Sequence, residues 1–181
     1  MKRCKWVNLN NPNYVKYHDF EWGVCVYDDN KLFEMLLLES FQAGLSWECI
    51  LNKRESFRKA FSYFDYNKIC EYDDKKINEL CNDKSIVRNR NKIIASVNNA
   101  RIFKSIVMEY GSFSSYIWGF TGGKVIKNTN DVFNTTNSLS DIVSSDLRKR
   151  GMKYVGSTII YSYLQSIGII FDHELNCCCY K

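Results

Sequence analysis

The sequence predicts an all-α fold, a single domain over residues 1–181 made of two intimately packed helical lobes. Apolar residues recur at the spacing of one helix face in Asp29–Gln42 and again in Asn91–Val107. Neither segment shows the strict alternation of a half-buried strand. Hydrophobic residues make up 45% of the 181 residues, enough to bury a core without disulfides or a partner chain. No linker is long enough to separate independent domains.

The two long helices are supported by their inward faces. Leu32, Phe33, Leu36 and Leu37 form the first face. The second face carries Ile93, Val97, Ala100, Phe103 and Val107. Shorter helices are expected at Tyr14–His18, Glu48–Phe61, Asp74–Cys81 and Phe113–Trp118.

Two further helices are expected near the C-terminus. A capping box beginning at Ser138 predicts a helix that ends at Arg150, just before Gly151. The next helix should cover residues 156–167, with Gly168 as its C-cap. The polar stretch Thr121–Asn137 is rich in Gly, Asn and Thr and predicts a surface loop.

Composition limits the class of protein. The net charge of +5 favours an acidic partner such as nucleic acid, although many soluble proteins are equally basic. The charged start Met1–Trp6 is not followed by the apolar stretch of a signal peptide, and no run approaches the ~20 apolar residues of a membrane span. We therefore expect a cytoplasmic protein without membrane contact, whose eight cysteines stay reduced and serve as metal ligands or buried thiols.

Cysteine and histidine are paired at both ends of the chain. Cys4 and His18 lie near the N-terminus, and His173 precedes Cys177 by one helical turn's spacing. Two Cys and two His are the usual ligands of a closed, structural zinc site. Alternatively, Cys4 is a buried thiol and the histidines are incidental, and the run Cys177–Cys179 leaves the choice of ligand open. Catalytic zinc is less favoured because the His-Glu-x-x-His motif is missing.

A basic turn in residues 147–158 indicates a helix-hairpin-helix. A helix that ends in basic residues is followed by a turn between Gly151 and Gly156, and a second helix begins with Ser157 and Thr158. Backbone N–H groups there could bind a phosphate. The side chains around it are Lys149, Arg150 and Lys153. The alternative is a solvated helix end with a glycine cap.

Glu39 is a carboxylate on an otherwise apolar helix, so it is either paired within the fold or directed into a cavity. After a break at Gly44, the exposed-looking Leu45 and Trp47 follow. Flat side chains that could stack on a nucleobase, or simply pack in the core, are Trp6, Tyr17, Trp22 and Trp47.

Eight motifs in order along the chain carry a resemblance to a known family. They are Arg3-Cys4-x-Trp6, Tyr17-His18-Asp19-x-Glu21-Trp22-Gly23, Leu32-Phe33-Glu34-Met35, Gln42-Ala43-Gly44-Leu45-Ser46-Trp47, Lys53-Arg54-Glu55, Ile86-x-Arg88-x-Arg90-x-Lys92-Ile93, Lys149-Arg150-Gly151-x-Lys153-x-Val155-Gly156-x-Thr158, and Asp172-His173 with Cys177-Cys178-Cys179-Tyr180. With them the chain resembles the bacterial 3-methyladenine DNA glycosylase I family over essentially its whole length. Two departures are Cys25, where family members usually have Pro, and a missing Pro-containing tail.

The resemblance implies a helix-hairpin-helix glycosylase fold with one structural zinc ion that joins the two termini. The implied zinc ligands are Cys4, His18, His173 and Cys177. The implied base pocket is formed by Trp6, Tyr17, Trp22, Glu39 and Trp47. The implied DNA contacts are Leu45, beside the gap left by the flipped nucleotide, and Lys149, Arg150, Gly151, Lys153, Gly156 and Thr158 in the hairpin.

The implied reaction is the hydrolytic excision of 3-methyladenine from alkylated double-stranded DNA by a monomer, which leaves an abasic site and free 3-methyladenine. The methylated base is cationic, so aromatic faces and a carboxylate suit it once it has left the duplex. Glu39, the candidate catalytic residue, is assigned to recognition and electrostatic stabilisation. Asp172 is given a structural role. No lysine stands in a Schiff-base position, so strand cleavage is not expected. The alternatives are a DNA-binding protein that has lost catalysis, and a zinc hydrolase with an open metal position.

Overall fold

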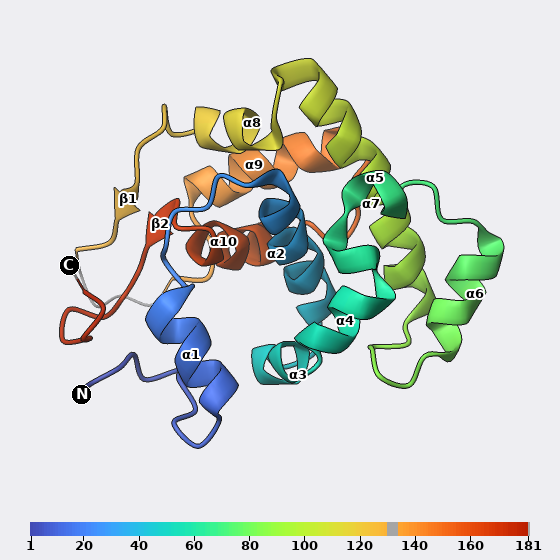
Figure 1. The fold of residues 1–181 in the computed structure, drawn as a ribbon. Helices are drawn as coiled ribbons and strands as arrows, with labels where there is room; N and C mark the ends of the chain where they lie inside the picture. The colour runs from blue at the N-terminus through green and yellow to red at the C-terminus, as the bar shows by residue number, and fades with distance from the viewer. Residues whose placement is uncertain (130–133, 181) are drawn as a thin grey trace.

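The computed structural model describes residues 1–129 and 134–180, and this part of the chain is mostly helical (Figure 1). The α-helices are α1 (Pro12–Phe20), α2 (Asp29–Gln42), α3 (Trp47–Asn52), α4 (Arg54–Ala60), α5 (Tyr66–Ile69), α6 (Asp74–Asn82), α7 (Arg90–Tyr110), α8 (Phe113–Gly119), α9 (Ser138–Lys149) and α10 (Ser157–Ser166). A 3-10 helix, η1 (Ser62–Phe64), and two short strands, β1 (Ile126–Lys127) and β2 (Ile170–Phe171), complete the described elements. The predicted all-α class is confirmed.

Helix α2 lies at the centre of the fold, where it packs against α3, α7, α8 and α10 (Figure 1). Every residue from Leu32 to Phe41 is buried. A helix that is enclosed on all sides needs apolar residues all round, and α2 supplies them except at Ser40 and two glutamates. Glu34 is neutralised by Arg54, whose Nε lies 2.7 Å from its carboxylate. The other glutamate, Glu39, belongs to the site described below.

The segment Glu48–Phe61, predicted as one helix, is divided at Lys53 into α3 and α4. Lys53 closes α3 and precedes the first turn of α4. The bend turns Arg54 inward, where it donates hydrogen bonds to Glu21 and Glu34 at 2.7–3.0 Å. This buried ion pair is a tertiary contact, so the helical periodicity of the sequence did not reveal the break. The short elements η1 and α5 were also not predicted.

Helix α9 begins where predicted, but its capping residue is Asn137 rather than Ser138. The Asn137 side chain accepts a hydrogen bond from the Ser140 amide at 2.8 Å, and Ser140 Oγ accepts one from the Asn137 amide at 2.9 Å. Asn and Ser are both good N-caps, so the sequence alone did not decide between neighbours. The capping box predicted from Ser138 is therefore displaced by one residue.

Strand β1 lies in the region predicted as a loop, and it pairs in parallel with β2. The amide of Ile126 donates to Ile169 O at 2.8 Å. Residues 130–133 of that predicted loop lie outside the described residues. The pair is too short for a sequence period to show, and it fastens the segment after α10 to the one after α8.

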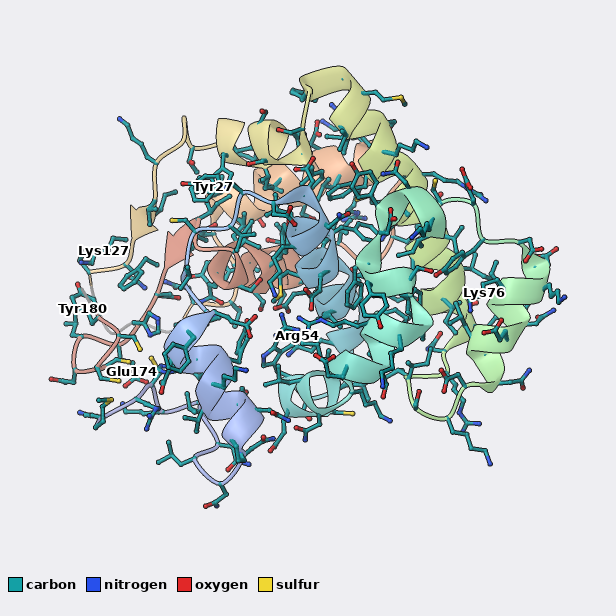
Figure 2. The ribbon with its side chains drawn as sticks, viewed as in Figure 1. Tyr27, Arg54, Lys76, Lys127, Glu174 and Tyr180 are labelled. Atoms are coloured by element: carbon teal, nitrogen blue, oxygen red, sulfur yellow. The ribbon has the colours of Figure 1, made fainter. Side chains whose placement is uncertain are left out.

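The two ends of the chain lie on the same side of the molecule (Figure 1). The amide of Cys178 donates to Lys2 O at 2.8 Å. Lys127 Nζ lies 4.4 Å from the ring centre of Tyr180, and both residues lie at this end of the molecule (Figure 2). Within the described ranges, no helix is long and apolar enough to cross a membrane.

The turn after α10 gives a test of the packing between the C-terminal and N-terminal segments. Gly168 follows the C-cap of α10 with φ +78°, and a Cβ atom there would lie 2.5 Å from backbone atoms of Val24 and Cys25. Gly168→Ala should therefore cost about 3 kcal/mol of unfolding free energy, from left-handed strain and a backbone clash together. Gly123→Ala is the matched control because Gly123 has φ +75° and open space around it, so strain alone should cost about 1 kcal/mol. Urea denaturation measures both, and equal losses would contradict the clash.

Candidate functional site

A cavity of about 460 Å³ opens between α1, α2, the start of α3, α10 and the segment after β2. This is in the size range of small-molecule sites. Its walls are aromatic and polar. The lining residues are Lys5, Trp6, Tyr14, Tyr17, Trp22, Glu39, Gln42, Trp47, Ser162, Gln165, Asp172, His173 and Glu174.

All the aromatic residues predicted for a base pocket line this one cavity. Trp6 and Trp22 meet edge to face, with ring centres 4.8 Å apart. Tyr17, on α1, lies 5.2 Å from Trp47, the first residue of α3. Burial raises the pKa of the Tyr17 phenol well above its usual value, so this wall is uncharged. The cavity thus offers several flat faces to a planar ligand.

Glu39 is a buried carboxyl group in the wall of the cavity. Its side chain is 3% exposed, and its Oε2 atom has no hydrogen-bond partner among the described residues. Burial alone raises the pKa of Glu39 to about 8. The indole Nε1 of Trp47 is also buried without a hydrogen-bond partner in the described chain. Such groups are costly in a folded protein, and here they lie in the walls of one cavity.

Several polar residues of the cavity were not among the predicted base-binding residues. Asp172, given only a structural role from the sequence, lines the wall. Its carboxylate accepts hydrogen bonds from Asn128 Nδ2 (2.7 Å), Tyr161 OH (3.0 Å) and Gln165 Nε2 (2.6 Å). Gln165 is also part of the wall. Gln165 follows Ser162 and Tyr161 on the same side of α10, so no feature of the sequence distinguished it from ordinary polar helix residues.

The predicted ligand set comes together beside this cavity. The donor atoms of Cys4, His18, His173 and Cys177 all lie within 4.8 Å of one another, and all four residues are buried. Cys4 Sγ and Cys177 Sγ lie 3.5 Å from His173 Nδ1, and Cys177 Sγ lies 3.4 Å from His18 Nε2. Tetrahedral zinc with ordinary bond lengths would place sulfur and nitrogen ligands about 3.5 Å apart. The cluster, called the tetrad below, could therefore bind a metal ion.

The atoms around the tetrad orient its ligands as metal sites require. His18 Nδ1 bonds to Asp19 at 2.8 Å and His173 Nε2 to Trp22 O at 3.2 Å, which leaves the other ring nitrogen of each free to face the sulfurs. Burial lowers the pKa of His173 to about 4, so its imidazole is in the neutral form that ligates metals. Each cysteine sulfur also accepts a backbone N–H, from Glu174 to Cys4 and from Cys179 to Cys177.

The tetrad and the cavity share a wall. The Trp22 ring lies 4.6 Å from the His173 ring, and the Trp6 ring lies 5.3 Å from the His18 ring. Trp6 is also only two residues beyond Cys4 in the chain. Any displacement of the tetrad would therefore move the aromatic wall.

The predicted hairpin is formed by α9, a turn and α10, which pack against each other. The turn is a Schellman motif, because Gly151 N donates to Arg148 O at 2.9 Å and Met152 N to Leu147 O at 3.0 Å. Gly151 adopts φ +97°, and Met152 is buried behind it. Among the described residues, no side chain caps the N-terminus of α10 at Gly156. Its first N–H groups are therefore available to an anion.

The side chains predicted to contact DNA differ in their surroundings. Lys149, Lys153 and Thr158 are exposed. Arg150 instead binds Glu109 at 2.6 Å and Asp146 at 2.8 Å. Its guanidinium thus joins the hairpin to the end of α7, a tertiary contact that the sequence did not reveal.

The hairpin is also tied to α2, the helix that carries Glu39, directly through Ser40 and indirectly through Asn99 and Lys92 of α7. Ser40 Oγ donates to Tyr154 O at 3.1 Å, and Tyr154 has the unusual φ of +56°. Asn99 clamps Lys153 by accepting its amide at 2.9 Å and donating to its carbonyl at 2.8 Å. Lys92 Nζ donates to Phe41 O at 2.8 Å and Ala43 O at 2.5 Å.

Lys92 therefore holds the end of α2. The turn that follows α2 presents Leu45, which is 40% exposed beside the cavity residues Gln42 and Trp47. An exposed apolar side chain at the cavity mouth is available for contact with a ligand.

Comparisons with known proteins agree on one family. A family model described as methyladenine glycosylase matches residues 6–180. The chain is 42% identical to DNA-3-methyladenine glycosylase 1 of Escherichia coli (strain K12), covering 99% of this chain and 97% of that protein. It is 39% identical to DNA-3-methyladenine glycosylase of Haemophilus influenzae, covering 98% and 97%. A crystal structure of 3-methyladenine DNA glycosylase I matches with a TM-score of 0.95 and 39% identity, over 99% of this chain and 100% of that one.

A second solved structure contains a ligand. It is a variant of 3-methyladenine DNA glycosylase I in complex with 3-methyladenine, with a TM-score of 0.93 and 33% identity. The match covers 100% of this chain and 98% of the other.

The buried carboxylate predicts a specific pH dependence of stability. Because the folded pKa of Glu39 is raised, its stability contribution is fully present below the usual carboxyl pKa and is lost as pH rises toward about 8. Glu39→Gln removes the charge. The unfolding free energy of the variant should therefore rise relative to that of the wild type between pH 5 and 8, by at most about 1.4 kcal/mol per pH unit. Urea denaturation across this range, with the exposed Glu71→Gln as control, measures the difference. A pH-independent difference would contradict the burial of a titrating carboxyl.

Proposed function

The chain belongs to the methyladenine glycosylase family, and we propose that it excises 3-methyladenine from alkylated double-stranded DNA, leaving an abasic site. The observation that carries this proposal is the carboxyl group of Glu39, whose buried Oε2 atom has no hydrogen-bond partner among the described residues and which lines a cavity walled by aromatic rings. A cationic planar ligand would supply the missing partner and the missing charge.

Recognition of the base follows from the charge of the lesion. Methylation at N3 makes the adenine ring cationic, and a cationic ring is attracted both to aromatic faces and to a carboxylate. Trp6, Tyr17, Trp22 and Trp47 would stack around the base, and Glu39 would accept its hydrogen bonds. Neutral adenine gains less from this environment, and it leaves Glu39 without a counter-charge. Charge therefore adds to shape in discriminating the damaged base from the normal one.

The base must leave the duplex to enter the cavity, which costs a few kcal/mol of unstacking and unpairing. We propose that Leu45 enters the gap and that phosphate contacts offset this cost. The uncapped N-terminus of α10 at Gly156 and Thr158, the turn at Gly151, and the exposed Lys149 and Lys153 suit a phosphate backbone. Arg150, predicted as a direct contact, would act by ordering this turn because its guanidinium is engaged by acidic side chains.

Hydrolysis breaks the bond between the sugar C1′ atom and the base. The base leaves as neutral 3-methyladenine with the bonding electrons, positive charge develops on the sugar, and water adds at C1′ and loses its proton to solvent. Binding the cationic base tightly does not by itself lower this barrier. Glu39 and the DNA phosphates would do so through their field on the developing sugar cation, together with orientation of the flipped nucleotide. Strand cleavage is not expected.

We further propose that the tetrad holds one structural zinc ion. Cys4, His18, His173 and Cys177 would complete a closed tetrahedral site, with no position left for substrate. When bound, zinc would supply a cross-link between the two ends of the chain, and the residues around it position Trp6 and Trp22.

We also propose that residues 1–181 form a single domain of two packed lobes and that the protein acts as a monomer in the cytoplasm. Retention of Glu39, Tyr17 and Trp47 in one cavity favours catalysis over a DNA-binding protein without activity.

The first test is base release from methylated duplex DNA, measured by chromatography with mass detection. The wild type should release 3-methyladenine and leave 7-methylguanine in place. Glu39→Ala should lower the single-turnover rate about 100-fold, as expected for the loss of one electrostatic contact to the transition state. Glu71→Ala, which removes an exposed carboxylate that does not line the cavity, should behave as the wild type. If folded wild-type protein released no base, the glycosylase proposal would fail, and a DNA-binding protein without catalysis would be the remaining alternative.

A second test removes the metal. A chelator should lower the melting temperature by about 10 °C, because zinc binding contributes several kcal/mol to folding. Binding of free 3-methyladenine, followed by tryptophan fluorescence, should weaken in parallel because the tetrad supports Trp6 and Trp22. A zinc hydrolase would instead lose activity while keeping its melting temperature.

A further inference from the structure

The tetrad is almost closed to solvent. Cys4 is 2% exposed, His18 0%, His173 5% and Cys177 6%. A strongly hydrated divalent cation does not enter such a site directly, because its waters must be replaced by protein ligands one at a time. A path of donor atoms from the surface to the tetrad would solve this problem.

Two further thiols lie between the tetrad and solvent. Cys178 is exposed, Cys179 is half-buried, and their sulfur atoms are 3.9 Å apart. The sulfurs of Cys177, Cys178 and Cys179 all lie within 4.8 Å of one another. Cys179 Sγ also lies within 4.8 Å of donor atoms of His18 and Asp19. Cys179 therefore belongs to two donor groups, each of which contains a member of the tetrad.

The backbone holds these thiols in place. Cys178 N donates to Lys2 O at 2.8 Å, and Cys179 N donates to Cys177 Sγ at 3.4 Å. The next residue, Tyr180, packs under Lys127 at the same end of the molecule (Figure 2). The two thiols are thus fixed beside the tetrad and do not belong to a loose tail.

We propose that Cys178 and Cys179 form a transit site for thiophilic divalent cations, through which zinc enters and leaves the tetrad. The inference rests on the proposed structural zinc. Thiolates are preferred ligands for such ions. Each thiol releases its proton to solvent as its sulfur binds the ion and takes up a proton again when the ion moves on. Cys178 makes the first contact, Cys179 the second, and Cys177 receives the ion into the tetrad.

The experiment measures exchange of the resident ion, because exit and entry follow the same path. The zinc-loaded full-length protein is mixed with excess cadmium, and exchange is followed by sulfur-to-cadmium absorbance and by native mass. The double variant Cys178→Ser/Cys179→Ser should exchange about tenfold more slowly than the wild type. The control Cys25→Ser/Cys49→Ser removes one exposed and one half-buried thiol that belong to none of the donor groups found in the described chain. It should exchange at the wild-type rate.

Two companion measurements separate transit from other roles. Both double variants should retain one zinc ion and the wild-type melting temperature, and cobalt-substituted protein should show two thiolate ligands in each. Equal exchange rates in all three proteins would overturn the proposal. So would loss of zinc or of a cobalt–thiolate band in the Cys178/Cys179 variant, since these thiols would then be resident ligands. A wild type that retains no zinc would reject the structural zinc itself, a result distinct from unchanged exchange.

Discussion

The geometry of this protein depends on how the two ends of its chain meet. The tetrad brings residues near each terminus within bonding range of a common centre, and the aromatic wall of the cavity rests directly on its imidazoles. Neither terminal segment contains a long helix that could hold it in place by packing. The short strand pair and the hydrogen bond from Cys178 to Lys2 support the same junction. The positions of Trp6 and Trp22 in the cavity wall thus depend on the tetrad.

The central helix shows a second constraint of the opposite kind. Glu34 and Glu39 are both buried on α2, yet one is neutralised by Arg54 and the other has no partner in the described chain. The first is the usual solution to a buried charge, and the second lowers stability in the empty protein. A folded protein tolerates a buried carboxyl group without a partner where a bound ligand supplies that partner. On this one helix, Glu34 therefore stabilises the fold, whereas Glu39 is placed to meet a ligand.

Much of this arrangement was predictable from local sequence. The long amphipathic patterns located α2 and α7, and Gly168 was correctly placed at the end of α10. The eight motifs pointed to the aromatic residues and the ligands that the structure gathers. What local pattern did not reveal depends on tertiary contacts. Lys53 interrupts a helix so that Arg54 can turn inward, and Arg150 is engaged by Glu109, which comes from another helix. Asp172 and Gln165 reach the cavity only because their segments pack beside α1 and α2.

The ties between α2 and the hairpin have a mechanical consequence. Ser40 of α2 bonds directly to the hairpin, and α7 makes a second link, because its Asn99 bonds to the hairpin and its Lys92 to the end of α2. These hydrogen bonds hold α2 and the hairpin at a fixed distance from each other, and this distance does not adjust to a substrate. In the proposed reaction a phosphate is held at the turn, and the flipped base reaches the carboxylate across a distance that the protein does not adjust. Deformation of the duplex would then supply the remaining movement, and DNA weakened by damage deforms at lower cost than an intact helix.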